Sequence, residues 1–287
     1  MRETAEKNKQ GAAARDPVGS LDSLESYLEL CGRACRGLDL ARLRDLAAAA
    51  ERHYSGRSGA SESETSPFRE LEQRWYASLD RGEPDYSVYG GELFLAEAWA
   101  CWRLYSRKYT RALALRGAVR GPRGRWRRGV DVLGNAHSIV DLGCGCGHAA
   151  AALRHLWPEA EVVGTNLRGT LQFAVARAMG REHNFSVRAA ATKHADLVFA
   201  SEYFEHVERP VDHLVEILKK TDPEYLVVAN SFSAVSVGHF RTYLGPAGEP
   251  VPCKKMARLF NLTLQERGYR RLETKFWNDR PAVWARA

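Results

Sequence analysis

The chain has 287 residues, which is enough for one large domain or for one standard domain with an accessory region. Hydrophobic residues at 45% and charged residues at 27% match an ordinary globular protein with a sizeable core. No run approaches the roughly 20 apolar residues that a membrane helix needs, and residues 1–16 lack the apolar centre of a secretory signal peptide. We therefore expect no membrane partner and a cytoplasmic location.

The first 130 residues predict helices. Residues 1–20 contain almost nothing to bury and predict a disordered tail. Apolar residues recur at helical spacing from Leu21 to His53 with a break at Gly37, and again over Pro67–Leu79 and Glu92–Leu115. The expected domains are a tail over 1–20, a helical accessory region over 21–130 with a flexible linker over 55–66, and a second domain over 131–287.

From Ser138 onward, short β-rich runs alternate with helical patterns, which indicates a parallel sheet with crossover helices. Only four residues separate the last two runs, so these two should form an antiparallel hairpin at one edge. The expected fold is an α/β, doubly wound, mostly parallel sheet of seven strands with an N-terminal helical region. The expected strands are Ser138–Leu142, Glu161–Asn166, Ser186–Ala189, Leu197–Ser201, Tyr225–Asn230, Arg271–Trp277 and Ala282–Arg286.

The six cysteines show no metal-binding pattern. No C-x2-C pair meets a second pair, or a pair of histidines, at zinc-finger spacing. We expect reduced, unpaired thiols and no metal site. The six are Cys31, Cys35, Cys101, Cys144, Cys146 and Cys253.

The strongest motif is a D-x-G-x-G-x-G loop within Ile139–His148, between an apolar strand and a helix. Glycines let the backbone turn sharply and approach a ligand at the carboxyl end of a strand, where open α/β sheets bind nucleotide-like cofactors. Asp141 gives the loop a charged partner for an ammonium group. The alternative is a tight strand-to-helix turn without a ligand.

This motif resembles the first motif of the class I S-adenosylmethionine (SAM)-dependent methyltransferases. The resemblance continues at Glu161–Leu167, which is similar to that family's second strand. In the family this strand usually ends in an acidic residue that holds the ribose hydroxyls, whereas here the position is Asn166, so an aspartate there is expected to tighten SAM. The resemblance implies SAM as cofactor, with contacts from Asp141, Gly143, Cys144, Gly145, Gly147, Asn166, Leu167 and Ser201.

The segment Ala195–Pro210 resembles the fourth strand and following loop of the small-molecule branch of this superfamily, where the loop faces the methyl group. His206 is the best candidate for an acid or base, because an imidazole can take a proton near neutral pH. It could equally be an orienting histidine, since methyl transfer depends mostly on alignment. Glu202 and Glu205 are further catalytic candidates that could also be solvated loop carboxylates.

The acceptor site is expected among aromatic and polar side chains outside the core motifs. N-terminal helices commonly cover SAM in this superfamily, so Tyr86, Tyr89, Trp99 and Trp102 are candidate lid aromatics. The long segment Phe232–Pro252 could line the acceptor pocket or be a surface loop. The resulting candidates for substrate binding are Tyr86, Tyr89, His239, Tyr243, Trp277 and Asn278.

A net charge of +7 and six arginines within Arg116–Arg128 leave room for an acidic partner. A cluster with Trp126 among its arginines could bind a nucleic acid, or could be a solvated basic linker. The expected function is methyl transfer to a small molecule or metabolite. The alternatives are a nucleic-acid or nucleotide methyltransferase that uses the arginine cluster and a non-catalytic SAM-binding partner protein. The acceptor atom and the oligomeric state stay open.

Overall fold

The computed structural model describes residues 21–56, 66–121, 123–134, 136–191 and 194–287. The tail expected over 1–20 and most of the linker expected over 55–66 lie outside these residues. No helix within the described ranges is long and apolar enough to cross a membrane.

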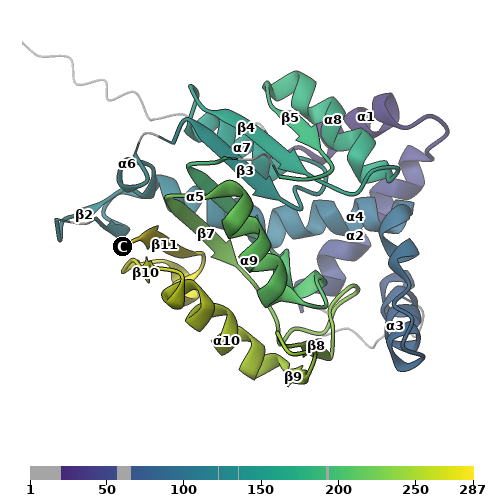
Figure 1. Ribbon diagram of the computed structural model, residues 1–287. Coiled ribbons are helices and arrows are strands. Elements are labelled where there is room, and N and C mark those ends of the chain that lie inside the picture. Colours follow the sequence, from purple (N-terminus) through teal and green to yellow (C-terminus); the bar gives the residue numbers. More distant parts are fainter. Residues whose placement is uncertain (1–20, 57–65, 122, 135, 192–193) are drawn as a thin grey trace, which may run out of the picture.

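A seven-stranded sheet forms the centre of the molecule, in the order β10-β11-β7-β6-β3-β4-β5 (Figure 1). The five strands from β7 to β5 are parallel, whereas β11 runs antiparallel to both of its neighbours. The expected α/β sheet with an antiparallel edge is therefore confirmed. The strands are β3 (Ser138–Leu142), β4 (Glu161–Thr165), β5 (Ser186–Arg188), β6 (Leu197–Ser201), β7 (Tyr225–Ala229), β10 (Tyr269–Arg271) and β11 (Ala282–Arg286).

Helices cover both faces of the sheet, because alternate side chains of the central strands enter different cores. In β6, Val198 and Ala200 pack toward α9 and α10, whereas Leu197 and Phe199 pack toward α5 and α7. Figure 1 shows α9 and α10 in front of the sheet, and α5 and α7 behind it. The helices of this half are α6 (Gly129–Val132), α7 (His148–Leu156), α8 (Leu171–His183), α9 (Pro210–Thr221) and α10 (Cys253–Glu266).

The N-terminal helices confirm the expected break at Gly37, whose φ is +83°. The long helix expected over Glu92–Leu115 contains a π-helical turn, so it divides into α4, η3 and α5. A third core joins this region to α7, α8 and the glycine loop rather than leaving it separate. The elements are α1 (Leu24–Ala34), α2 (Leu40–Tyr54), α3 (Pro67–Asp80), η2 (Tyr86–Gly90), α4 (Glu92–Cys101), η3 (Trp102–Ser106) and α5 (Arg107–Ala114).

The strand expected over Arg271–Trp277 is wrong, since β10 covers only Tyr269–Arg271. The chain beyond it pairs with the segment before the sheet: Glu273 accepts a hydrogen bond from Arg120 N at 2.9 Å, and Lys275 N donates to Ala118 O at 2.8 Å. The short η4 (Phe204–His206) and η5 (Trp277–Asp279) follow β6 and precede β11. Two hairpins were not predicted: β1 (Val119–Arg120) with β2 (Trp126–Arg127), and β8 (Thr242–Leu244) with β9 (Pro250–Pro252).

Candidate active site

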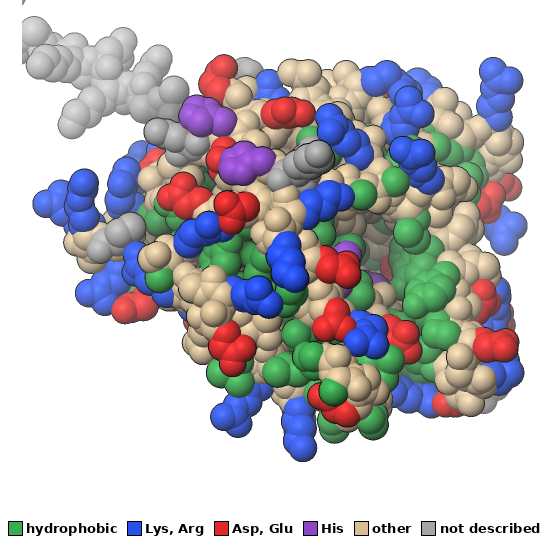
Figure 2. Space-filling view, viewed as in Figure 1, with side chains coloured by type: hydrophobic (Ala, Val, Ile, Leu, Met, Phe, Trp, Pro, Cys, Tyr) green, Lys and Arg blue, Asp and Glu red, His purple; other side chains and the backbone are tan. Residues whose placement is uncertain are grey.

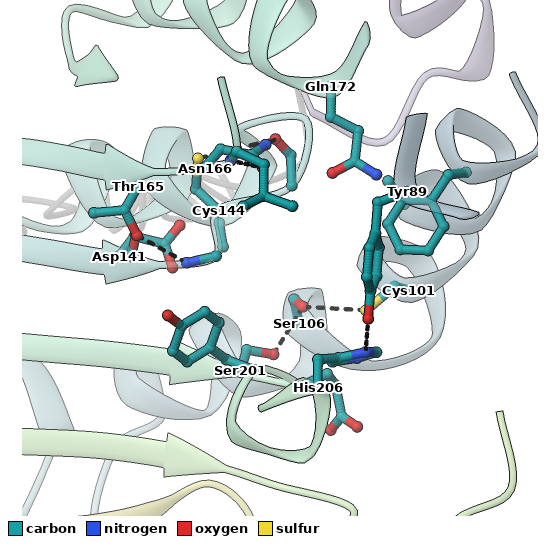
Figure 3. A pocket seen from close by; sticks show the side chains of 18 of the residues that line it. Tyr89, Cys101, Ser106, Asp141, Cys144, Thr165, Asn166, Gln172, Ser201 and His206 are labelled. Atoms are coloured by element: carbon teal, nitrogen blue, oxygen red, sulfur yellow. Dashed lines mark hydrogen bonds between the residues drawn. The ribbon is translucent and has the colours of Figure 1, made fainter. Parts of the chain in front are cut away.

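A cavity of about 320 Å³ opens at the carboxyl ends of β3, β4 and β6 and is covered by η2, α4 and η3. Figure 2 shows the surface hollowed there, with hydrophobic side chains along one wall. Loops at this edge of a parallel sheet converge on a bound ligand. We call this space the first cavity; Figure 3 shows the side chains that line it.

The glycine loop forms one wall of the first cavity. Gly143 and Gly145 have φ of +63° and +54°, a region that side chains with a Cβ rarely adopt. A Cβ on Gly143 would lie 2.3 Å from the Tyr203 ring, whereas one on Gly145 would meet only Ala98, at 3.9 Å. The loop is tied to β4 by Cys144 N, which donates to Thr165 O at 2.8 Å. Gly145 therefore leaves open backbone facing the cavity.

Asp141 is a buried acid of the first cavity, with 2% of its surface exposed. Its Oδ2 has no hydrogen-bond partner among the described residues. Burial raises the pKa of this carboxyl to about 8, and a backbone hydrogen bond from Ala150 partly offsets the effect. A buried, unpaired carboxyl oxygen beside open glycine backbone fits the ammonium end of an amino acid, as SAM carries.

Asn166 closes the loop through its side-chain amide. Its Nδ2 donates to Gly145 O at 2.7 Å, and its Oδ1 accepts from Leu167 N at 2.7 Å. An aspartate could make the second bond but not the first, because a carboxylate does not donate. Leu167 lies at the cavity with 55% of its surface exposed.

Ser201 ends β6 at the cavity and contacts a residue that the sequence analysis missed. Its Oγ lies 2.8 Å from Ser106 Oγ, on the π-helical turn η3 (Figure 3). Cys101, Thr165 and Gln172 also line the cavity without having been predicted. For Cys101 and Ser106, only the packing of the covering helix on the sheet determines which side chains face inward, whereas Thr165 ends β4 and Gln172 lies on α8.

His206 and Tyr89 meet at the far wall of the first cavity (Figure 3). Tyr89 Oη lies 3.2 Å from His206 Nδ1. Burial lowers the pKa of His206 well below its usual value, and His239, with ring centres 4.7 Å apart, lowers it further. His206 is therefore neutral near pH 7, and the same burial weakens it as a base. Tyr86 lines the same cavity with 49% of its surface exposed.

The two glutamates near His206 differ. Glu202 lines the cavity, has a φ of +50°, and accepts a hydrogen bond from Tyr109 Oη at 3.1 Å. Glu205 is fully buried and lines neither cavity; its Oε1 accepts from Ser231 N at 2.6 Å. Burial, with a smaller contribution from Glu202, raises the pKa of Glu205 above its usual range. Glu205 therefore holds the loop after β7 in place.

A second cavity of about 340 Å³ lies behind His206 and shares four residues with the first: Glu97, Cys101, Glu202 and His206. Of the predicted acceptor residues outside the lid, His239 lines this cavity. Tyr243 is in the core and donates to Glu205 O at 3.1 Å, and Trp277 and Asn278 line neither cavity. Of the two lid tryptophans, Trp102 lines the first cavity; Trp99 stacks on Tyr27.

The arginine cluster forms the β1–β2 hairpin on the side of the molecule opposite α2 and α3 (Figure 1). Arg120 binds both carboxylate oxygens of Glu273, and Arg128 pairs with Asp131 at 2.6 Å. Lys275 Nζ lies 4.2 Å from the ring centre of Trp126. The cluster lines neither cavity. Within the described ranges, no group of three or more metal-ligating side chains comes together, and all six cysteines are free.

Comparison with known proteins gives a family model described as "Methyltransferase domain", which matches residues 140–228. No curated protein matches. A solved mitomycin 7-O-methyltransferase, MmcR, is 16% identical with a TM-score of 0.42, covering 96% of this chain and 74% of that one. An O-methyltransferase family protein from Burkholderia thailandensis is 14% identical with a TM-score of 0.46, covering 67% and 58%. A putative sarcosine dimethylglycine methyltransferase from Galdieria sulphuraria is 17% identical with a TM-score of 0.30, covering 34% of this chain and only 41% of that one.

Proposed function

Because residues 140–228 match a methyltransferase domain model, we propose that the chain is a class I SAM-dependent methyltransferase that transfers a methyl group to a small-molecule acceptor held in the second cavity. The observation that carries the proposal is the wall shared by the two cavities. Glu97, Cys101, Glu202 and His206 face both spaces. A donor in the first cavity and an acceptor in the second would meet there, and proximity with correct alignment supplies much of the rate in such a reaction.

The first cavity fits SAM, which supplies an electrophilic methyl group on a sulfonium when bound. Asp141 would hold the amino group, and the open backbone at Gly145 would approach the amino-acid part. Asn166 keeps that backbone in place rather than offering a free carboxylate to the ribose. Glu97 and Cys101 of α4 face both cavities and would cover the space between donor and acceptor.

His206 would take the acceptor's proton or hold the acceptor in line. Its Nδ1 side faces Tyr89 and Gly238, since a Cβ on Gly238 would lie 2.5 Å from Nδ1. The backbone of Gly238 lies against the ring and raises the pKa of His206, an effect smaller than that of burial. In the tautomer with the proton on Nδ1, Nε2 would keep its lone pair for the acceptor, and Tyr89 would fix the orientation of the ring.

Two measurements test the proposal. SAM and S-adenosylhomocysteine should bind the purified protein in calorimetry, and incubation of a cell extract with protein and methyl-labelled SAM should label a component of low molecular mass. Label that appears only in nucleic acid, or SAM binding without any labelled product, would contradict a small-molecule acceptor.

A further inference from the structure

The second cavity has an unbalanced set of ionisable side chains. Three carboxyl groups line it, from Glu72, Glu97 and Glu202, together with His53, His206 and His239. No Lys or Arg is among the described lining residues. The nearby Arg280 is exposed and donates to Ser231 Oγ at 2.9 Å. Within the described residues, the lining of the chamber therefore carries no lysine or arginine, and Arg280 only borders it.

Two lining groups, the Glu97 carboxyl and the Tyr54 hydroxyl, each have a buried oxygen without a hydrogen-bond partner among the described residues. Only 9% of the surface of Glu97 is exposed, and its Oε2 is the oxygen that has no partner within the described part of the chain. Burial raises the pKa of this carboxyl well above its usual value; the polar hydroxyl of the neighbouring Tyr54 partly offsets the effect, and the charge of Glu72 adds to it. Tyr89 and Cys101 also face Glu97, and neither brings positive charge. A buried, unpaired carboxyl in a cavity calls for a ligand that completes it.

The histidines do not supply that charge. Burial lowers the pKa of His239 to about 4, and His206 is held neutral in the same way. His53 Nε2 lies 3.2 Å from Glu72 Oε1, so this histidine already has an acidic partner. A carboxylate or phosphate ligand would meet no lysine or arginine among the described lining residues, so its charge would stay unpaired and the site disfavours it.

We propose that the second cavity takes an acceptor carrying a protonated amino group, with the ammonium bound to Glu97. The inference rests on the proposed function, since it names the acceptor class of the same site. Tyr54 and Tyr105 also line the cavity and offer aromatic surface to a cation. A charge-assisted hydrogen bond from the ammonium to Oε2 would remove the unpaired buried group.

Binding of a cation should also change the ionisation of Glu97. Burial raises the pKa of this carboxyl and so favours its protonated form in the empty cavity. An ammonium against it favours the carboxylate, so amine binding should release a proton. A neutral ligand of the same shape should release none.

The experiment titrates three probes into the full-length protein saturated with S-adenosylhomocysteine. The probes are 2-phenylethylamine, its neutral counterpart 2-phenylethanol, and the anion 3-phenylpropanoate. Calorimetry in two buffers of different ionisation enthalpy measures affinity and proton release together. We expect the amine to bind about tenfold or more tightly than the alcohol, with proton release, and the anion to bind most weakly.

Glu97→Gln should lower the amine affinity about tenfold, remove the proton release and leave the alcohol and S-adenosylhomocysteine affinities unchanged. Glu92→Gln, on the same helix but outside both cavities, should change nothing. Equal affinity of the wild type for amine and alcohol, or a preference for the anion, overturns the inference even if the variant does not fold. A loss of S-adenosylhomocysteine affinity in Glu97→Gln would assign Glu97 to the cofactor instead. Absence of any cofactor binding would overturn the proposed function itself.

Discussion

The two cavities are built in different ways. The first has open backbone at Gly145, and nine of its lining residues come from two short stretches, residues 141–149 and 165–167, that lie where two adjacent parallel strands end. The second collects side chains from α2, α3, α4, η3 and the loops after β6 and β7. A site made of backbone suits a ligand that a whole family shares, whereas a site made of scattered side chains can change its ligand by single substitutions.

Substitution of His206, one of the four residues that face both cavities, should give the largest effect. If His206 is a base, His206→Ala should lower kcat by about 10²–10⁴ with SAM affinity nearly intact. Steady-state kinetics with calorimetry on the same preparation checks both. His206→Asn, which can still hydrogen-bond, should keep most of the rate if the ring only orients the acceptor. An Ala variant within about threefold of wild type, with an unchanged pH profile, would remove His206 from catalysis and leave alignment as the mechanism.

The backbone character of the first cavity is tested at Gly145. Valine is strained at a φ of +54° and would place methyl groups in the cavity, so SAM affinity should fall about 100-fold or more. Gly248→Val is the matched control, because Gly248 also has a positive φ, +82°, and open space around it, but lies between β8 and β9. It should destabilise without weakening SAM. Equal SAM affinities in the two variants would remove the glycine loop from the site.

Ionisation of Asp141 should lower the stability of the protein and raise its affinity for SAM as the pH rises. Its pKa is raised from 3.8 to about 8, so the folded protein keeps a proton that the unfolded chain has lost, and the stability linked to this group falls as pH rises from about 4 to 8. Asp141→Asn should flatten that slope and raise the melting temperature at pH 8. SAM needs the charged form, so wild-type affinity should rise from pH 6 to 8, whereas the variant should bind about tenfold more weakly at pH 8 without pH dependence. Parallel pH profiles for the two proteins would contradict this.

Asn166→Asp should give the smallest effect, with a sign opposite to the sequence-based expectation. The carboxylate loses the 2.7 Å hydrogen bond to Gly145 O and faces that carbonyl with a negative charge. We therefore expect SAM to bind a few-fold more weakly, about 1 kcal/mol, in calorimetry. Tighter binding would mean that a new contact with the ribose outweighs the loss of the hydrogen bond from Asn166 to Gly145 O.

The sequence predicted what is local. Short sequence patterns, which can be recognised without knowing any tertiary contact, predict six of the seven strands, the glycine loop and the position of His206. The seventh strand was misplaced because its residues pair with Ala118–Arg120, more than 150 positions earlier. Glu97, Cys101 and Ser106 escaped notice because they lie on one long helical pattern, and only tertiary packing decides which side of it faces a cavity.

The π-helical turn Trp102–Ser106 should affect how homologous sequences align with this chain. A π turn accommodates one residue more than regular helix, and one residue corresponds to a rotation of about 100°. Removing it by a one-codon deletion would turn Tyr109 and the rest of α5 away from their partners, or Cys101 and α4 away from theirs. Homologues that lack this turn should therefore align with the chain only through a one-residue gap. In each such homologue, different side chains of this helix should line the second cavity.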